Sequence, residues 1–196
     1  LVLARVVYSK EIFFGFLVWN LFLAAVPLGL SRLLRQREKR LGTAAVLALT
    51  GLWLLFFPNA PYILTDLFYL EARHRVPLWY DLAVFLSFAW NGLVLGFMSL
   101  RDVQRVLERR FGVLIAWASV LGALALGSFG IYLGRYLRWN SWDVLTNPLA
   151  LAQDVAARVL TPRQPPGAWG LTIVFTGFLL LAYLTLGSFA QDEEPR

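Results

Sequence analysis

Residues 78–100 read LWYDLAVFLSFAWNGLVLGFMSL, a run with one charged residue, Asp81. A helix needs roughly 20 mostly apolar residues to cross a hydrocarbon core that is about 30 Å thick. Backbone N–H and C=O groups find no water inside a bilayer, and an α-helix satisfies them within the segment. This run therefore predicts a membrane-spanning helix over 78–100.

Four further apolar runs have the length of a span, at about 11–30, 43–64, 111–134 and 169–190. The composition agrees, because a chain with 59% hydrophobic and only 15% charged residues has too little charge to cover a water-facing surface. We expect an all-α, polytopic transmembrane bundle of about five spans, forming a single integral membrane domain over residues 1–196. The chain has no cysteine, which excludes disulfides and thiolate catalysis.

The longest connection between spans, 135–168, contains a further predicted helix over about 148–160. Asn147 followed by Pro148 is typical of a helix start, since proline is favoured at the first helical position. An apolar side and a charged side predict that this helix lies in the membrane interface. The apolar side holds Leu151, Val155 and Val159, and the other holds the pair Asp154 and Arg158.

Two compact basic segments set the expected orientation. Residues 31–40 hold five Lys or Arg and residues 101–110 hold four. Short loops rich in Lys and Arg stay in the cytoplasm. Both loops are therefore predicted to be cytoplasmic, which puts the N-terminus outside and the C-terminus in the cytoplasm. Because topology accounts for the net charge of +6, we expect no nucleic-acid partner.

The second span is interrupted by FPNAPY at 57–62. Pro58 and Pro61 each remove a backbone donor, so the helix is expected to kink or break around Asn59. Two interpretations are open. The freed backbone groups are satisfied by neighbouring helices, or they help to form a binding site, as discontinuous membrane helices do.

The third span carries a polar stripe. Tyr80, Ser87 and Asn91 follow helical spacing from the expected outer boundary toward the middle of the membrane. Such a stripe faces protein or water rather than lipid. It either forms hydrogen bonds between helices, for instance to Asn20, or forms the wall of a cavity that opens to the outside.

In the fourth span, small residues recur every three or four positions and include the GxxxG pair Gly130 and Gly134. This spacing lets another backbone approach closely, so we interpret the stripe as a packing surface.

The predicted topology gathers polar residues at the outer face, where ionisable groups are costly unless they are paired, hydrated or used. The candidate catalytic acids are Asp66, Asp81 and Asp143. The candidate substrate-binding residues are Asn59, Tyr80, Asn91, Arg135, Arg138, Trp139, Asn140 and Trp142. Each acid taken alone also has a structural explanation, as a helix cap, as a charge that favours the helix dipole, or as a partner of a nearby arginine.

A divalent cation is the one cofactor that these residues suggest. Its expected ligands are the oxygens of Asp66, Asp81 and Asp143, joined by His74 or Asn140, although no metal-specific spacing is present.

Two functions remain open. In the first, the outer face binds or acts on a lipid headgroup or a small anionic solute, with Arg135 and Arg138 holding the anion and the tryptophans setting the depth. In the second, the protein is not an enzyme and serves as a transporter-like cavity or as a subunit that binds another membrane protein. Membrane lipids are the expected partners in either case.

Three motifs resemble those of a known family: FPNAPYILTDL at 57–67, WYD at 79–81 and GIYLGRYLRWNSWD at 130–143. Together they resemble the domain of unknown function 1361 family of uncharacterised bacterial integral membrane proteins. The resemblance spans most of the chain and implies a location in the bacterial cytoplasmic (inner) membrane. It implies no chemistry.

Overall fold

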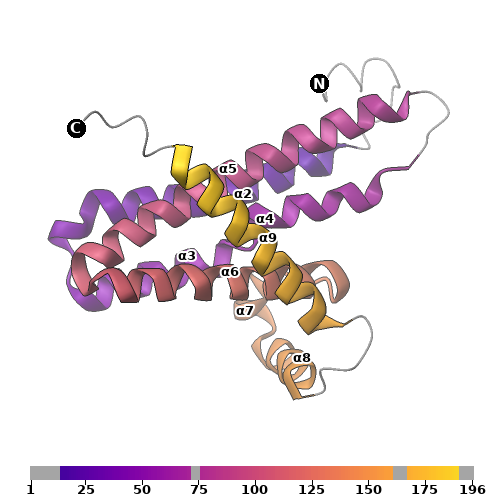
Figure 1. Cartoon of the computed structure of the whole chain (residues 1–196). Helices are drawn as coiled ribbons and strands as arrows, with labels where there is room; N and C mark the ends of the chain where they lie inside the picture. The colour runs from indigo at the N-terminus through magenta and orange to yellow at the C-terminus, as the bar shows by residue number, and fades with distance from the viewer. Residues whose placement is uncertain (1–13, 72–75, 161–166, 190–196) are drawn as a thin grey trace. The chain divides into compact units, whose positions relative to one another are not determined.

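The computed structural model describes residues 14–71, 76–160 and 167–189. The predicted all-α class is confirmed, since the regular structure of these residues is helical (Figure 1). The elements are α2 (Gly15–Arg37), η1 (Glu38–Arg40), α3 (Thr43–Phe56), α4 (Asn59–Tyr62), η2 (Ile63–Tyr69), α5 (Leu78–Phe111), α6 (Val113–Tyr136), α7 (Asp143–Thr146), α8 (Pro148–Leu160) and α9 (Ala168–Phe189). The chain divides into two compact units, Leu1–Val106 and Leu107–Arg196.

Within the described residues, five helical segments are long and apolar enough to cross a membrane, as predicted. They are Gly15–Arg40, Thr43–Tyr69, Leu78–Phe111, Val113–Tyr136 and Ala168–Ser188. Large apolar side chains such as Phe22, Leu114 and Leu181 are 59%, 83% and 67% exposed. Apolar surface of this extent suits contact with lipid tails rather than water. The chain is therefore a multi-pass membrane protein.

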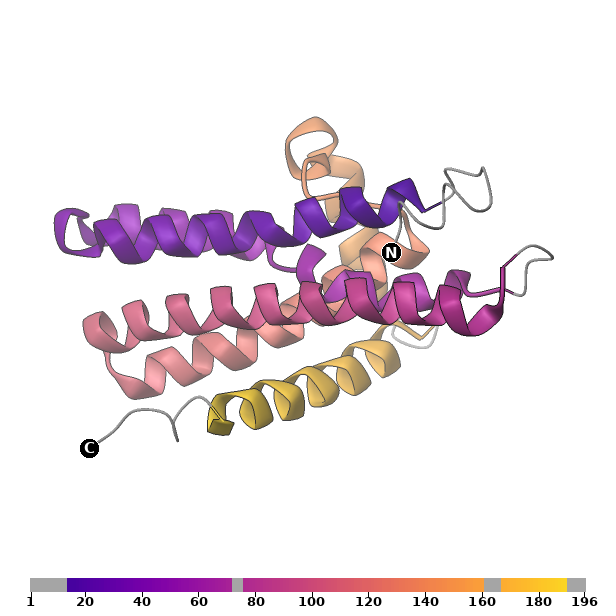
Figure 2. The ribbon, with the colours of Figure 1, turned by 90° about the horizontal axis from the view of Figure 1, so that it is seen from above.

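In the first unit, α2 and α5 run in the same direction (Figure 2). Phe14 and Phe85 stack edge to face near the starts of the two helices, with ring centroids 5.1 Å apart. Toward their ends, Arg35 Nη1 lies 2.6 Å from Asp102 Oδ1. The segment from α3 to η2 runs the opposite way and packs against α2. It also contacts α5, where Trp53 Nε1 donates to Ser99 Oγ at 3.1 Å.

The break predicted in the second span is confirmed. Helix α3 ends at Phe56, and the chain continues through the short helix α4 into the 3-10 helix η2. Asn59 Nδ2 donates to the Phe56 carbonyl oxygen at 2.9 Å, and the Ala60 amide donates to Phe57 at 3.1 Å. Pro61 has no N–H for the Phe57 carbonyl group, so the Ala60 amide pairs with it and Asn59 Nδ2 takes the place of Ala60 at Phe56. The side-chain amide of Asn59 therefore supports the break from within its own segment, whereas the first interpretation expected partners on neighbouring helices.

Helix α5 approaches α4 and η2 closely at two glycines. A Cβ atom added to Gly92 would lie 2.8 Å from Ile63 Cγ2 and 2.9 Å from the Ala60 carbonyl oxygen. One added to Gly96 would lie 2.9 Å from Ala60 Cβ. Gly92 and Gly96 form a GxxxG pair that lets the broken segment approach α5 closely. Sequence analysis had recognised such a pair only in the fourth span.

We expect Gly92→Ala to destabilise the protein by about 1–3 kcal/mol, because backbone atoms of α4 cannot move aside as a flexible side chain would. Gly51→Ala is the matched control, since Gly51 lies in α3 and nothing lies within 4 Å of its added Cβ. The control should be neutral or stabilising by up to about 1 kcal/mol. Unfolding in detergent, followed by circular dichroism, measures both changes. Equal effects of the two substitutions would contradict the close approach.

The two basic segments are parts of helices and not loops, which corrects the sequence interpretation. Helix α2 runs on to Arg37 and is followed by η1, while 101–110 lies within the last three turns of α5. The chain reverses only at Gly42 and at Gly112, where a φ of 90° favours glycine. The arginines of the two basic segments therefore project from helices at fixed spacing.

In the second unit, α6 packs against α9, and the rings of Phe129 and Trp169 lie 6.5 Å apart. Helix α8 has the predicted bounds. Its least exposed side differs from the prediction, however, because it includes Asp154 and Arg158 as well as Leu151 and Val155. Trp139 Nε1 donates to Asp154 Oδ2 at 2.8 Å, which turns that side of α8 toward the segment after α6.

The predicted orientation can be measured because the chain has no native cysteine. In whole cells, a membrane-impermeant maleimide should label Gln153→Cys on α8 and should label Lys39→Cys on η1 only after permeabilisation, since positive charge is retained in the cytoplasm. Labelling of both residues from the same side would overturn the orientation.

Candidate functional site

Three polar residues of the first unit are almost completely buried. They lie at the end of the unit that holds η2 and the start of α5. The exposed fractions are 1% for Thr65, 1% for Asp66 and 2% for Asp81. Carboxylates are almost never this buried unless they are paired, because desolvating a charge costs several kcal/mol. These two acids are the strongest indication of a site among the predicted residues.

Asp66 is held by a helix that is remote in sequence. Asn20 Nδ2 on α2 donates to Asp66 Oδ2 at 2.8 Å, which joins α2 to η2. The hydrogen bond between Asn20 and Asn91, one example of the predicted contacts between helices, is not the one that Asn20 makes here. Instead, Asn20 is a site residue that sequence reasoning missed. The available signal was a lone amide side chain in an otherwise apolar first span.

Asp81 lies in the first turn of α5, where a negative charge interacts favourably with the helix dipole. Its neighbour Tyr80 packs against a buried apolar cluster of Phe14, Leu17, Val84 and Phe85. This cluster also contacts Leu67, the residue after Asp66. Both acids therefore border one apolar core, in which an unpaired charge would be expensive.

Two other polar residues of the first unit, Thr65 and Asn91, bond within their own segments. Thr65 Oγ1 donates to the Tyr62 carbonyl oxygen at 2.7 Å. Asn91 Nδ2 donates to the Ser87 carbonyl oxygen at 2.8 Å, and Asn91 is exposed. The expected hydrogen bond from Asn91 to Asn20 is therefore replaced by a bond within α5. The cavity predicted beside Asn91 stays a prediction.

In the second unit, the segment after α6 is tightly organised. Arg138 has a φ of 61°, a left-handed conformation that side chains other than glycine rarely adopt, and it ends the helix. Asp143 Oδ2 accepts a hydrogen bond from the Asn140 amide at 2.7 Å, and Asp143 Oδ1 accepts one from Thr146 Oγ1 at 3.2 Å. Asp143 thus stabilises its own turn, and its catalytic role stays a prediction.

The cationic and aromatic residues of this segment differ in exposure. Arg138 is exposed, Trp142 is 41% exposed, and Arg135 and Trp139 are half-buried. Asp66 and Asp81 belong to the first unit, whereas Arg135 to Asp143 belong to the second. The predicted convergence of the two sets stays a prediction.

The metal hypothesis gains no support from the described residues, which contain no group of three or more His, Asp or Glu side chains that could hold an ion. The predicted ligand His74 lies outside the described residues.

Asn20→Ala tests whether the bond to Asp66 holds this end together. We expect a loss of about 1–3 kcal/mol in the free energy of unfolding, since a buried carboxylate loses a charge-assisted donor. Ser87→Ala is the control, because the Ser87 hydroxyl donates only to the Ala83 carbonyl of its own helix in the contacts described. That change should stay within about 0.5 kcal/mol. Similar losses for both variants would argue against a stabilising role for Asn20.

Comparison with known proteins places the chain in a family. A family model described as a protein of unknown function (DUF1361) matches residues 19–182, so the chain belongs to this family. No curated protein and no solved structure matches the chain. The resemblance drawn from the three motifs is thereby confirmed.

Proposed function

We propose that the end of the protein carrying Asp66 and Asp81 is an extracytoplasmic site that binds the headgroup of a membrane lipid. The observation that carries this proposal is the near-complete burial of two carboxylates in a membrane protein. Such residues are rare in membrane spans and are expensive unless they are paired or used.

Acidic groups select the cationic part of a ligand. A buried carboxylate attracts an ammonium group more strongly than an exposed one does, because the low dielectric of the surroundings screens the interaction less. A headgroup such as phosphoethanolamine carries an ammonium group and a phosphate together. The carboxylates of Asp66 and Asp81 are suited to bind the ammonium group.

Lipid phosphate groups require donors of their own, for which Arg135 and Arg138 of the second unit are the candidates. Guanidinium groups bind phosphate through two parallel hydrogen bonds, and tryptophan rings such as Trp139 and Trp142 prefer headgroup depth. The carboxylates of the first unit and the arginines of the second are proposed as two separate contacts to lipid headgroups.

The test compares Asp66→Asn and Asp81→Asn with Glu71→Gln, an exposed acid near the same end. Each protein is purified in mild detergent, and the retained phosphatidylethanolamine is counted by native mass spectrometry. We expect each aspartate variant to lose about tenfold in apparent affinity, which corresponds to one charge-assisted contact, and the control to bind as the wild type does.

Arg138→Gln should lower the same binding, because Arg138 is exposed and would contact the phosphate. Circular dichroism of each variant separates loss of binding from loss of folding. Wild-type lipid retention in folded Asp66, Asp81 and Arg138 variants would refute the site and would favour the alternative of a subunit or transporter-like role.

A further inference from the structure

The first unit contains a cavity of about 470 Å³ at the end opposite to Asp66 and Asp81. Its lining comes from the last turns of two helices only. Helix α2 contributes Arg32, Arg35 and Gln36, and α5 contributes Met98, Arg101, Asp102 and Arg105. Cavities of this size are typical of small-ligand sites. We refer to it as the arginine pocket.

The pocket exists because both basic segments continue as helices. Residues three, four or seven positions apart share one side of a helix, so Met98, Arg101, Asp102 and Arg105 form one face of α5. Arg32, Arg35 and Gln36 do the same on α2. Since the two helices run in parallel, these two faces meet at the same end.

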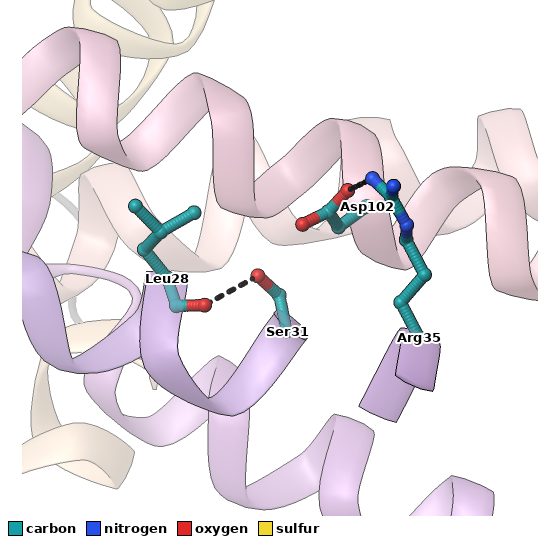
Figure 3. A network of polar contacts seen from close by, with 4 residues as sticks. All are labelled: Leu28, Ser31, Arg35 and Asp102. Atoms are coloured by element: carbon teal, nitrogen blue, oxygen red, sulfur yellow. Dashed lines mark hydrogen bonds and ion pairs between the residues drawn. The ribbon is translucent and has the colours of Figure 1, made fainter. Parts of the chain in front are cut away.

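One ion pair joins the two walls of the pocket. Arg35 Nη1 lies 2.6 Å from Asp102 Oδ1, and the Asp102 side chain is only 9% exposed (Figure 3). Ser31, one turn before Arg35, is turned to its own helix, where its hydroxyl donates to the Leu28 carbonyl oxygen at 3.0 Å. The pair joins α2 to α5 and holds the guanidinium group of Arg35 against Asp102.

The charges that line the pocket do not balance. Four arginines face one aspartate, which leaves a formal excess of three positive charges. Guanidinium groups held around one cavity repel one another, and an anion inside the cavity relieves the repulsion. Because Asp102 already accepts from Arg35, the other three arginines are the ones available to such an anion.

The chemistry of the donors favours phosphate. The planar guanidinium group matches phosphate oxygens with two parallel hydrogen bonds, and arginine is preferred over lysine where such geometry matters. Gln36 adds a neutral donor. Met98, which is 44% exposed, supplies an apolar wall beside the charges and suits a ligand that carries carbon atoms next to its phosphate.

Retention of positive charge on one side of the membrane would explain arginines at this end without any cavity. That explanation applies equally to Arg37, Lys39 and Arg40, which do not line the pocket. The lining arginines differ because they border one cavity from two helices that the ion pair between Arg35 and Asp102 joins. Charge retention needs no such arrangement.

We propose that the arginine pocket is a binding site for a phosphate group, either of an anionic phospholipid or of a soluble phosphate compound. The site is separate from the headgroup site at the other end and does not depend on it.

The double variant Arg32→Gln, Arg101→Gln tests the proposal against the double variant Arg37→Gln, Lys39→Gln, which removes the same charge outside the pocket. Two probes are used with the full chain: inorganic phosphate, titrated by calorimetry into protein in neutral detergent, and nanodiscs that contain phosphatidylglycerol in phosphatidylcholine, assayed by native mass spectrometry. The pocket variant should bind at least one probe about a hundredfold more weakly than the wild type does, at about tenfold for each charged contact. The control should change binding less than about threefold.

The two probes identify the source of the phosphate. Loss with both probes indicates a site that accepts phosphate in general, whereas loss only in nanodiscs indicates a phospholipid. Equal binding by the pocket variant and the control, or no binding of either probe by the wild type, overturns the proposal.

Two single variants keep the test decisive if the double variant does not fold. Arg105→Gln removes an exposed pocket arginine and should weaken binding about tenfold. Asp102→Asn removes the negative charge from the lining and should strengthen phosphate binding. If the arginines serve only the fold, the two substitutions will not change phosphate binding in opposite directions. That result would refute the proposal.

Discussion

The backbone carbonyl groups released by Pro58 and Pro61 are the constraint on which the first unit depends. In an apolar environment a carbonyl group without a donor costs several kcal/mol, so the chain cannot leave it unpaired. The Ala60 amide pairs with the Phe57 carbonyl group that Pro61 leaves without a donor, and Asn59 Nδ2 then donates to the Phe56 carbonyl group in place of Ala60. The helix can then end in mid-span and continue in a new direction as α4 and η2.

The break has two consequences for packing and for the site. Ala60 and Ile63 come to lie against Gly92 and Gly96, where the absence of side chains on α5 makes room for them. The 3-10 helix that follows carries Asp66 to Asn20 on α2. A continuous α-helix would turn these residues by 100° per position along one straight axis and would not give the same contacts.

Helix α2 is tied to its neighbours by polar contacts near both ends. Asn20 contacts a buried carboxylate near one end, and Arg35 contacts another near the other end. Between them, α2 is largely apolar, as a span requires. Buried polar contacts contribute less to net stability than their strength suggests, because desolvation offsets them, but they are specific about which partners meet. The acidic end and the arginine pocket are therefore both products of the register between α2, η2 and α5.

The candidate site was predictable in part. Asp66 and Asp81 stand out in the sequence because each interrupts or borders an apolar run, and their burial agrees with that interpretation. Asn20 could not be identified as the partner of Asp66, because the break changes the direction of the chain between Pro58 and Tyr69. Asn59 and Asp143 make local hydrogen bonds to a carbonyl and an amide group, and their roles in a site stay predictions.

The sequence by itself determined the helical class, the five spans, the break in the second span and the bounds of α8. These follow from local rules: the length of apolar runs, the missing donor of proline and the preference of proline for a helix start. Only the tertiary structure decided that Gly92 and Gly96 receive α4 and that Asn20 binds Asp66. It also decided that two segments interpreted as basic loops are helical ends that enclose a pocket. These features depend on which faces of separate helices meet, and side-chain spacing along one helix does not specify its neighbour.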